Sequence, residues 1–441
     1  MTSVLPKEIN YNLPVSLPAG VQTFDINVLP VNGTNFSCAT AGAFVQFDLP
    51  ARSGYMDGKT LALRYKYTCV SSGTTRIRAC PFFTPLLRLE TIFGSQPVQN
   101  INEYGQLMNM IINLTHNVAD KAGSVTGYGW KLEGDVAVHT WQSTDGRYCS
   151  QNEVGTFFGP VKGCILSEAD RYIPTGMMPN IRLQLTLDSI ANIFAPAVAA
   201  VTPVNLESGQ PYANATVLPT DFILSDFVLS YSQIDFGAEV DNTIRSMGDK
   251  ITIKSQSFNS SSNPINTGTS GQFELIYSQK MASVKSLFLH CGSTSTNGKF
   301  DAYEITNGGD CQFSIASRLY PQSRPLSSAI GHRGTLLLEL KKAVGSLYDK
   351  HNSMSINLQE YLTLGTASTT VNPAKVYYGV NTEQLQSDSV LLSGVSTQNS
   401  PVTVRLNIAT ATPAPVSATL ISAFDVLIEV SPSEKSARVI Q

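Results

Sequence analysis

The histidines are the first side chains to test for chemistry, because imidazole acts as a general base and as a metal ligand near neutral pH. The five lie far apart in the sequence, at His116, His139, His290, His332 and His351. No His-Glu-x-x-His motif occurs, and no two histidines have the spacing of metal ligands. His290 beside Cys291 suggests a catalytic dyad, but neighbours on a strand point to opposite faces. We therefore expect structural or surface roles for all five.

A second candidate for chemistry is the stretch Gly292–Phe300, GSTSTNGKF, which is similar to a phosphate-binding loop. It misses the G-x-x-x-x-G-K-S/T spacing by one residue, and Phe300 stands where the metal-binding hydroxyl belongs. We expect a loop between strands here. No Gly-x-Ser-x-Gly elbow occurs, and no pair of carboxylates is singled out, although acids distant in sequence can meet in space. The sequence predicts no catalytic, cofactor-binding or metal-binding residue, and no enzyme.

The cysteines indicate neither a disulfide framework nor a zinc site. Their number is odd, their spacing is wide and no Cys-x-x-Cys occurs. We expect free, buried thiols in a reducing compartment. The seven positions are Cys38, Cys69, Cys80, Cys149, Cys164, Cys291 and Cys311.

Two tryptophans leave one binding function open. Trp130 and Trp141 flank a polar, strand-like stretch, and aromatic side chains exposed in a loop bind sugars. Packing in the core is the interpretation that we favour for both. A carbohydrate-binding or adhesive β-sandwich protein is the alternative function, and a β-sandwich hydrolase is a third.

Composition narrows the class of protein further. Charged residues make up only 14% of the 441, against about 25% in a typical soluble domain. Low charge indicates that other subunits cover much of the surface. The net charge is −3, and Lys7 is the only basic residue among the first fifty. Because coating nucleic acid requires clustered Lys and Arg, we expect no direct nucleic-acid binding.

Neither the N-terminus nor the most apolar stretch of the sequence predicts a membrane or secretion signal. The N-terminus lacks the charged-then-apolar signal pattern. Ile190–Val204 is too short to span a bilayer and contains two prolines, so we expect a buried connection. We expect a soluble chain that is not secreted by the usual route.

The sequence predicts a long series of strands, which would position these residues. Strict alternation of apolar and polar residues marks half-buried strands at 61–67, 181–187 and 402–408. Shorter apolar runs predict further strands, and Pro, Gly and Asn clusters separate them. These runs are Phe24–Leu29, Phe44–Leu49, Phe227–Tyr231, Ile251–Ile253, Phe273–Tyr277, Val284–Leu289 and Leu420–Val430.

Two stretches have helical spacing, one in each half of the chain. In Asn100–Leu114 we expect Asn100 to cap the helix and Glu103 to complete a capping box. Gly334–Leu347 carries an apolar side, a Glu339–Lys342 pair, and Gly345 near its end. Strands in series with one helix per half predict an all-β chain of two similar domains, residues 1–232 and 233–441.

Four stretches resemble the major capsid proteins of double jelly-roll viruses, especially virophages and Polinton-like viruses. That lineage includes adenovirus hexons and tectivirus coat proteins. The stretches cover about a fifth of the chain, and none is a strict motif. They are NINEYGQLMNMIINL at 100–114, FILSDFVLSYSQIDF at 222–236, YPQSRPLSSAIGHRGTLLLELKKAVGSL at 320–347 and LISAFDVLIEVSPSEKSARVIQ at 420–441.

The resemblance implies two tandem jelly-roll β-sandwiches with short inserted helices. Residues 222–236 would form the closing strand of the first jelly roll. Residues 320–347 would form a helix-bearing excursion of the second, and 420–441 its last strand with a short tail. It further implies a non-catalytic major capsid protein, in homotrimeric, pseudo-hexagonal capsomers that tile the icosahedral shell of a double-stranded DNA virus.

The expected partners follow from that resemblance. They are copies of the same chain, neighbouring capsomers, and minor and penton capsid proteins, in a virion whose subunits are made in the host cytoplasm or nucleus. The Pro-interrupted Met1–Ala19 and the tail Ser431–Gln441 are expected to act as arms. Such arms would clamp neighbouring capsomers or, at the N-terminus, contact an inner membrane.

Overall fold

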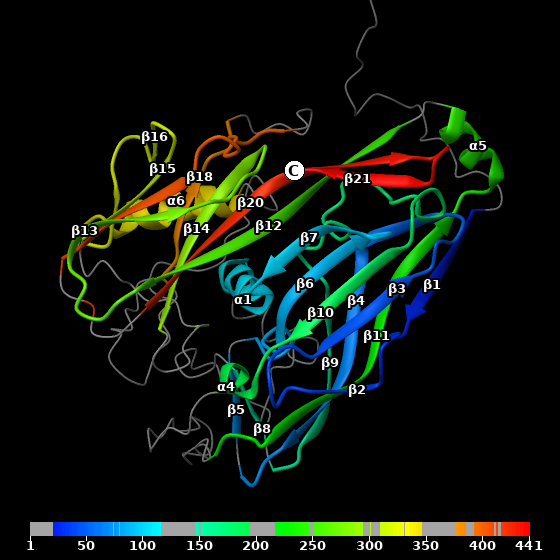
Figure 1. The fold of residues 1–441 in the computed structure, drawn as a ribbon, viewed down its shortest axis with the longest axis horizontal. Helices are drawn as coiled ribbons and strands as arrows, with labels where there is room; N and C mark the ends of the chain where they lie inside the picture. The colour runs from blue at the N-terminus through cyan, green and yellow to red at the C-terminus, as the bar shows by residue number, and fades with distance from the viewer. Residues whose placement is uncertain are drawn as a thin grey trace, which may run out of the picture.

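The computed structural model shows two β-sandwiches side by side (Figure 1). Each consists of two antiparallel sheets, so the all-β prediction is confirmed. The residues that the structure describes are 21–73, 75–78, 80–115, 146–149, 151–194, 217–246, 250–293, 300, 309–329, 331–345, 376–384, 392–409, 412 and 416–441.

The first sandwich is built from the strands that precede residue 236. One sheet has the order β1-β11-β4-β9, with β2 also on β11, and the other has the order β3-β10-β6-β7. A separate ladder joins β5 to β8. The bounds are β1 Gln22–Val28, β2 Asn35–Ser37, β3 Phe44–Leu49, β4 Tyr55–Val70, β5 Thr75–Arg78, β6 Leu86–Phe93, β7 Gln96–Asn102, β8 Gly146–Cys149, β9 Val154–Pro160, β10 Ile181–Leu187 and β11 Asp221–Asp235.

The second sandwich is built from the strands that follow residue 250. One sheet has the order β12-β20-β14-β18, with β21 also on β20, and the other has the order β13-β19-β15-β16, with β17 also on β15. The bounds are β12 Ile251–Ile265, β13 Gly271–Tyr277, β14 Val284–Ser293, β15 Asp310–Ile315, β16 Arg318–Tyr320, β17 Leu326–Ser327, β18 Tyr378–Asn381, β19 Val402–Ile408, β20 Val416–Ser431 and β21 Ser436–Ile440.

The two sandwiches have the same topology. Each half has eight strands on its two main sheet paths, which leaves out β2, β5, β8, β17 and β21. When these eight are numbered in chain order, one sheet of each half has the order 1-8-3-6 and the other has the order 2-7-4-5. Helix α1 (Tyr104–Thr115) and helix α6 (Arg333–Gly345) both lie between the fifth and sixth strands. The prediction of two tandem β-sandwiches, each with a helix inserted between strands, is therefore confirmed at the level of topology.

Local periodicity produces most of these strands. Along β10 and β19, buried residues alternate with partly buried or exposed ones, because successive side chains point to opposite faces. All ten predicted strand segments lie within strands of the structure or overlap them closely. Strand β20 differs, since nearly all of its residues are buried on both faces. It lies between β12 and β14 in the middle of its sheet.

The predicted start of the first helix is wrong. Asn100 is part of β7, paired with Glu90 of β6, and its Oδ1 atom accepts a hydrogen bond of 2.6 Å from the Arg88 Nε atom. Glu103 has a left-handed φ of 52° and forms the turn between β7 and α1. The capping-box pattern was misleading because the strand ladder of β6 and β7 takes up residues 100–102.

The second helix agrees better with its prediction. Helix α6 ends at Gly345, and Glu339 accepts a hydrogen bond of 2.6 Å from the Lys342 ammonium. Among the described residues, two α-helices were not predicted, α4 (Ile190–Ile193) and α5 (Ala238–Ser246). Helix α5 has an acidic first turn and Arg245 in its last turn, which suits the helix dipole.

The predicted C-terminal arm is wrong. Residues Ser436–Ile440 form β21, which turns back and pairs with β20. The side-chain amide of Gln441 then donates a hydrogen bond of 2.5 Å to the carbonyl oxygen of Val98 in the first sandwich. The N-terminal arm, Met1–Ala19, lies outside the described residues.

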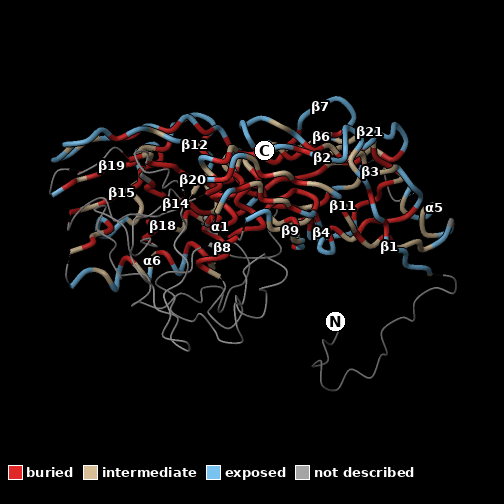
Figure 2. Tube along the Cα trace, turned by 90° about the horizontal axis from the view of Figure 1, so that it is seen from below, coloured by how far each residue is buried: buried red, intermediate tan, exposed pale blue. Residues whose placement is uncertain are grey.

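The two sandwiches share one core. Buried apolar residues form a single contiguous cluster that includes Ile26 of β1 and Val430 near the end of β20. Figure 2 shows buried positions continuing from the strands of one half into those of the other. Helix α1 lies at this junction (Figure 1), where it packs against β6.

Candidate assembly surfaces and buried polar sites

Most of the candidate residues from the sequence lie outside the part of the chain that the structure describes. His290 is buried on β14, and His332 is exposed just before α6. The remaining candidates lie outside the described residues: His116, His139, His351, Trp130, Trp141 and positions 294–299 of the glycine-containing loop. Among the described residues, no group of three His, Cys, Asp or Glu side chains is arranged to hold a metal ion.

His290 occupies an apolar site between the two sandwiches. Its Nδ1 atom lies 2.5 Å from the amide nitrogen of Gln106 on α1, and its ring packs 5.7 Å from the ring of Tyr377. Complete burial lowers the pKa of His290 to about 3. The ring is thus neutral at physiological pH. A buried, neutral imidazole that packs between the two sandwiches has a structural role.

The cysteines that the structure describes are all free and buried, as predicted. Cys69 differs from the others in its ionisation. A hydrogen bond with Cys149 is the main cause that lowers the pKa of the Cys69 thiol to about 7, against the opposing effect of burial. For Cys164, burial raises the pKa of the thiol. A polar neighbour thus has the larger effect on the Cys69 thiol, and burial has the larger effect on the Cys164 thiol.

The junction between the sandwiches contains a dense set of hydrogen bonds around Gln99 of β7. The side-chain amide of Gln99 donates to the Gly163 carbonyl oxygen at 2.8 Å and to the Ser257 hydroxyl of β12 at 2.7 Å. Its Oε1 atom accepts from the Thr91 hydroxyl and from the Ile165 backbone N–H. One buried side chain thereby joins three segments of the first sandwich to the second.

Helix α1 contributes a second set of polar contacts at this junction. Its residues from Tyr104 to Leu114 are all buried, including the polar Gln106, Asn109 and Asn113. Asn109 donates to the Phe300 carbonyl oxygen at 3.3 Å, and Asn113 lies 3.5 Å from the Tyr377 hydroxyl. The polar side of this amphipathic helix, which periodicity would assign to solvent, is covered by the second sandwich.

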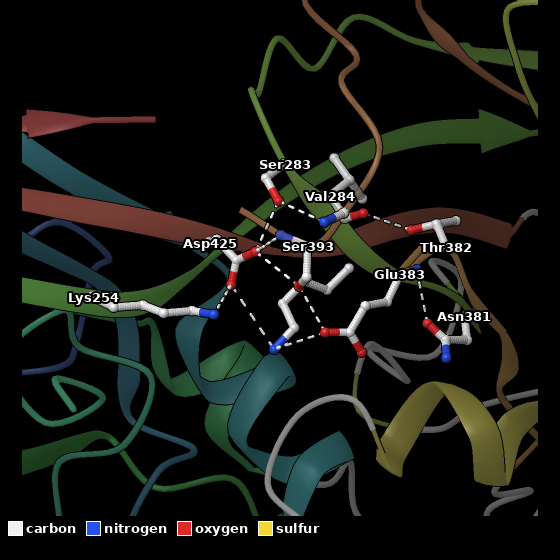
Figure 3. Close-up of polar contacts among 10 residues, drawn as sticks. Lys254, Ser283, Val284, Asn381, Thr382, Glu383, Ser393 and Asp425 are labelled. Carbon is white, nitrogen blue, oxygen red and sulfur yellow. Dashed lines mark hydrogen bonds and ion pairs between the residues drawn. The ribbon is translucent and has the colours of Figure 1, made fainter. Parts of the chain in front are cut away.

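A buried cluster of charges surrounds Asp425 in the middle of β20 (Figure 3). The Oδ2 atom of Asp425 accepts hydrogen bonds from the Ser283 hydroxyl at 2.8 Å and from the Ser393 backbone N–H at 2.9 Å. Its Oδ1 atom lies 3.8 Å from the ammonium of Lys254 and 3.9 Å from that of Lys285. The Asp425 side chain is 1% exposed.

Glu383 extends the cluster. It lies 3.8 Å from Lys285 and accepts a hydrogen bond of 2.6 Å from the Ser393 hydroxyl. Two carboxylates thus alternate with two ammonium groups. Hydrogen-bond donors reach the Oδ2 atom of Asp425, whereas its Oδ1 atom has the two ammonium groups as its ion-pair partners and no hydrogen bond from the described residues. The cluster holds Glu383 and Ser393, which are far from Asp425 in sequence, against the central strand. No sequence pattern signals it, because its four charged members lie on four separate segments.

A surface hollow of about 550 Å³ lies at the end of the first sandwich. Three aromatic rings line it. The centre of the Phe236 ring lies 5.4 Å from that of Tyr55 and 6.3 Å from that of Tyr172. Helix α5 forms one wall with Val240 and Ile244. The other lining residues are Asp57, Lys59, Ala169, Asp170 and Arg171. The Tyr55 hydroxyl donates to Asp241 of α5 at 2.8 Å, which helps to hold the helix in place.

Corresponding elements of the two sandwiches differ in burial. Strand β12, the first of the second sandwich, has four consecutive buried residues from Ser255 to Phe258. Its counterpart β1 has four consecutive exposed residues, Gln22–Asp25. Helix α1 is buried on all sides, whereas its counterpart α6 exposes Leu338 by 52%. Within the chain, the first sandwich covers β12 and the second covers α1.

No helix of the described residues is long and apolar enough to cross a membrane. No family model matches the sequence, and no curated protein matches it closely enough to count as a relative.

Solved structures give close matches in fold. The PBCV-1 virus capsid model matches with a TM-score of 0.60 at 9% identity, over 98% of this chain and 99% of that one. The Faustovirus major capsid protein matches with a TM-score of 0.59 at 10% identity, over 98% of this chain and 93% of that one. A chain of the Sputnik virophage structure matches with a TM-score of 0.56 at 10% identity, over 100% and 92%.

These matches span the whole chain, so both sandwiches and their order are shared with the capsid proteins. The identity is low, and the likeness is one of fold. It confirms the resemblance seen in the sequence and the closing strand expected at 222–236, which is β11. The chain therefore has the double jelly-roll fold found in viral major capsid proteins.

Proposed function

We propose that the chain is a non-catalytic major capsid protein. Three copies would form a pseudo-hexagonal capsomer, and such capsomers would tile the icosahedral shell of a double-stranded DNA virus. The observation that carries the proposal is the repeated 1-8-3-6 and 2-7-4-5 topology. Two equivalent sandwiches per chain supply six in a trimer, which suits a six-sided tile.

The unequal burial of equivalent elements supports the trimer and suggests how copies meet. Within the chain, the α1 side of the first sandwich packs on the β12 side of the second. The second sandwich offers the equivalent α6 side, and the first offers the equivalent β1 side. Neither side is covered by the other sandwich among the residues that the structure describes. A head-to-tail contact between α6 of one copy and β1 of the next would repeat the internal junction and close a ring.

We place the domain boundary at residue 232, so that residues 1–232 form the first jelly roll with its N-terminal arm and 233–441 form the second. Sheet membership supports a division in this region, because the sheets of the first half end with β11 and those of the second begin with β12. Strand β11 runs three residues past the proposed boundary, to Asp235, and β12 begins at Ile251. The shared core at the junction gives the two jelly rolls a fixed relation.

The partners would be other copies of this chain, neighbouring capsomers, and minor and penton proteins of the shell. The N-terminal arm is the segment proposed for contact with an inner membrane. Low charge and the lack of a basic cluster support assembly without direct nucleic-acid binding. The protein would reside in the virion after synthesis in the host cytoplasm or nucleus.

The test is the mass of the purified chain in solution by light scattering after size exclusion. One chain is 47.6 kDa, so a trimer should have three times that mass, about 143 kDa. Assembled shells should then be visible by electron microscopy at high protein concentration. A chain that stays monomeric at every concentration contradicts the proposal.

Charge substitutions test the proposed contact surfaces separately. Leu338→Asp on α6 and Phe24→Asp on β1 should each shift the mass toward 47.6 kDa, because each places a carboxylate in the contact. Ile276→Asp on β13 is the matched control, since Ile276 is 60% exposed and lies on neither surface. If the unmodified chain is a trimer and both variants also remain trimers, the surfaces are wrong although the trimer stands.

A further inference from the structure

We infer that the aromatic hollow at the end of the first sandwich is a binding site for the N-terminal segment of the same chain, residues 13–20. The site does not depend on the capsid function proposed above. It consists of the rings of Tyr55, Tyr172 and Phe236 under helix α5. Tyr172 is 47% exposed, which leaves a large aromatic surface open to a ligand.

The position of the hollow selects this occupant. Gln22, the first residue of β1, pairs with Asp235, the last residue of β11. Phe236, which follows Asp235 in the sequence, lines the hollow. Tyr55, at the start of β4, pairs with Ile234. The hollow therefore lies about two strand spacings, roughly 10 Å, from Gln22, where the N-terminal segment joins β1. Five extended residues reach roughly 17 Å, so Leu17 is within range.

The chemistry of the segment matches the lining. Residues 13–20 read LPVSLPAG, with two prolines, three larger aliphatic side chains and no charge. Extended Pro-rich segments bind grooves lined by aromatic rings, because such segments lose little conformational entropy on binding. The four charged lining residues, Asp57, Lys59, Asp170 and Arg171, sum to zero, so an uncharged segment meets no net field.

Covalent linkage favours the chain's own segment over that of another copy. A short tether gives an effective concentration on the order of millimolar, which makes a weak contact sufficient. An arm held in this way is bound to its own subunit, in contrast to the expectation that it clamps a neighbour. The segment of another copy is thus the main competing occupant, and the experiment distinguishes the two.

The test is a disulfide crosslink in the full chain. Cysteines are introduced by Leu17→Cys and Arg171→Cys, and diamide serves as the oxidant. Arg171 has a side chain that is 76% exposed, so the substitution should not disturb folding, and the native cysteines described are buried. We expect a 17–171 disulfide to form rapidly within one chain, identified by peptide mass spectrometry.

The control pair is Leu17→Cys with Val154→Cys. Val154 is 63% exposed and pairs with Thr68, at the opposite end of β4 from the hollow, roughly 36 Å away along the strand. This pair should crosslink at least tenfold more slowly. Adding Tyr172→Ser to the 17–171 pair should also slow the crosslink about tenfold, since an aromatic contact is lost.

Two results would overturn the inference. One is equal crosslinking of the 17–171 and 17–154 pairs. The other is a crosslink between chains, detected as mixed peptides when ¹⁵N-labelled and unlabelled proteins are combined. Hydrogen exchange in the unmodified chain gives an independent measurement. The α5 amides should exchange about tenfold faster after Leu13→Ser with Leu17→Ser, and unchanged exchange also counts against the site.

Discussion

Single buried polar residues hold the two jelly rolls of this chain together. Gln99 joins β7 to β12, and Gln106 joins α1 to His290 of β14. Asp425 anchors separate segments on the central strand of the second sheet. A buried polar group costs free energy unless it is hydrogen-bonded, so the contacts of Gln99 and Gln106 stabilise one particular arrangement of the two halves. The contacts of Asp425 act within the second sandwich.

The histidine gives a pH dependence. Burial depresses the pKa of His290 to about 3, whereas an unfolded histidine titrates near 6.5. Below about pH 6.5 the unfolded chain binds a proton that the folded chain excludes, so stability is complete above that pH and falls as the pH approaches 3. At pH 5 the loss is about 2 kcal/mol.

Urea unfolding at pH 7 and pH 5 measures this loss. In the His290→Gln variant the difference in unfolding free energy between the two pH values should shrink by about 2 kcal/mol. His332→Gln is the matched control, because His332 is exposed and should leave the difference unchanged. An unaltered pH dependence in His290→Gln would show that the histidine is not the group responsible.

The charge cluster gives a second prediction. Asp425→Asn removes one of two carboxylates that face two largely buried ammonium groups, and breaking a buried ion pair costs about 3–5 kcal/mol. Glu274→Gln breaks the Glu274–Arg405 pair, whose side chains are 50% and 57% exposed, and should cost at most about 1 kcal/mol. Chemical denaturation compares the two, and equal losses would contradict the assigned role of Asp425.

At the scale of elements, two glycines differ in how closely other atoms pack around them, so alanine should change the stability of the chain in opposite directions at the two positions. A Cβ atom on Gly58 of β4 would lie 1.8 Å from the backbone carbonyl oxygen of Leu166. Gly334, in α6, has no atom within 4 Å of such a Cβ. The strand therefore depends on glycine for close approach to the 164–168 turn, and the helix does not.

Alanine substitution tests this difference. Gly58→Ala forces backbone apart and should lower the unfolding free energy by more than about 3 kcal/mol. Gly334→Ala should raise it by up to about 1 kcal/mol, because alanine has the higher helix propensity. Thermal unfolding monitored by circular dichroism measures both. A Gly58→Ala variant as stable as the unmodified chain would mean that the 164–168 turn does not lie against β4.

At the scale of the whole molecule, the continuous core predicts cooperative unfolding. Domains joined by a linker unfold independently, but here one apolar cluster and the contacts of α1 cross the junction. We expect a single calorimetric transition in which the whole chain unfolds as one cooperative unit, so that the calorimetric enthalpy per chain equals the van't Hoff enthalpy. Two resolved transitions, one for each jelly roll, would contradict a shared core.

The sequence by itself determined the local structure. Residues 181–187 and 402–408 were predicted as strands to the residue, because a strand's two-residue period is visible wherever one face is buried and the other is not. Helix α6 was predicted from a different local signal, the spacing of apolar residues along a helix. The double jelly-roll fold came from resemblance in four stretches, and solved structures at 9–10% identity share it.

Only the tertiary structure decided how those elements are covered. Asn100 belongs to β7 because β6 pairs with it, against a capping pattern that pointed to a helix. Gln106, Asn109 and Asn113 are buried because a second sandwich lies over the polar side of α1. The Asp425 cluster and the aromatic hollow join segments that are far apart in sequence. Such contacts depend on long-range packing, and no local pattern records them.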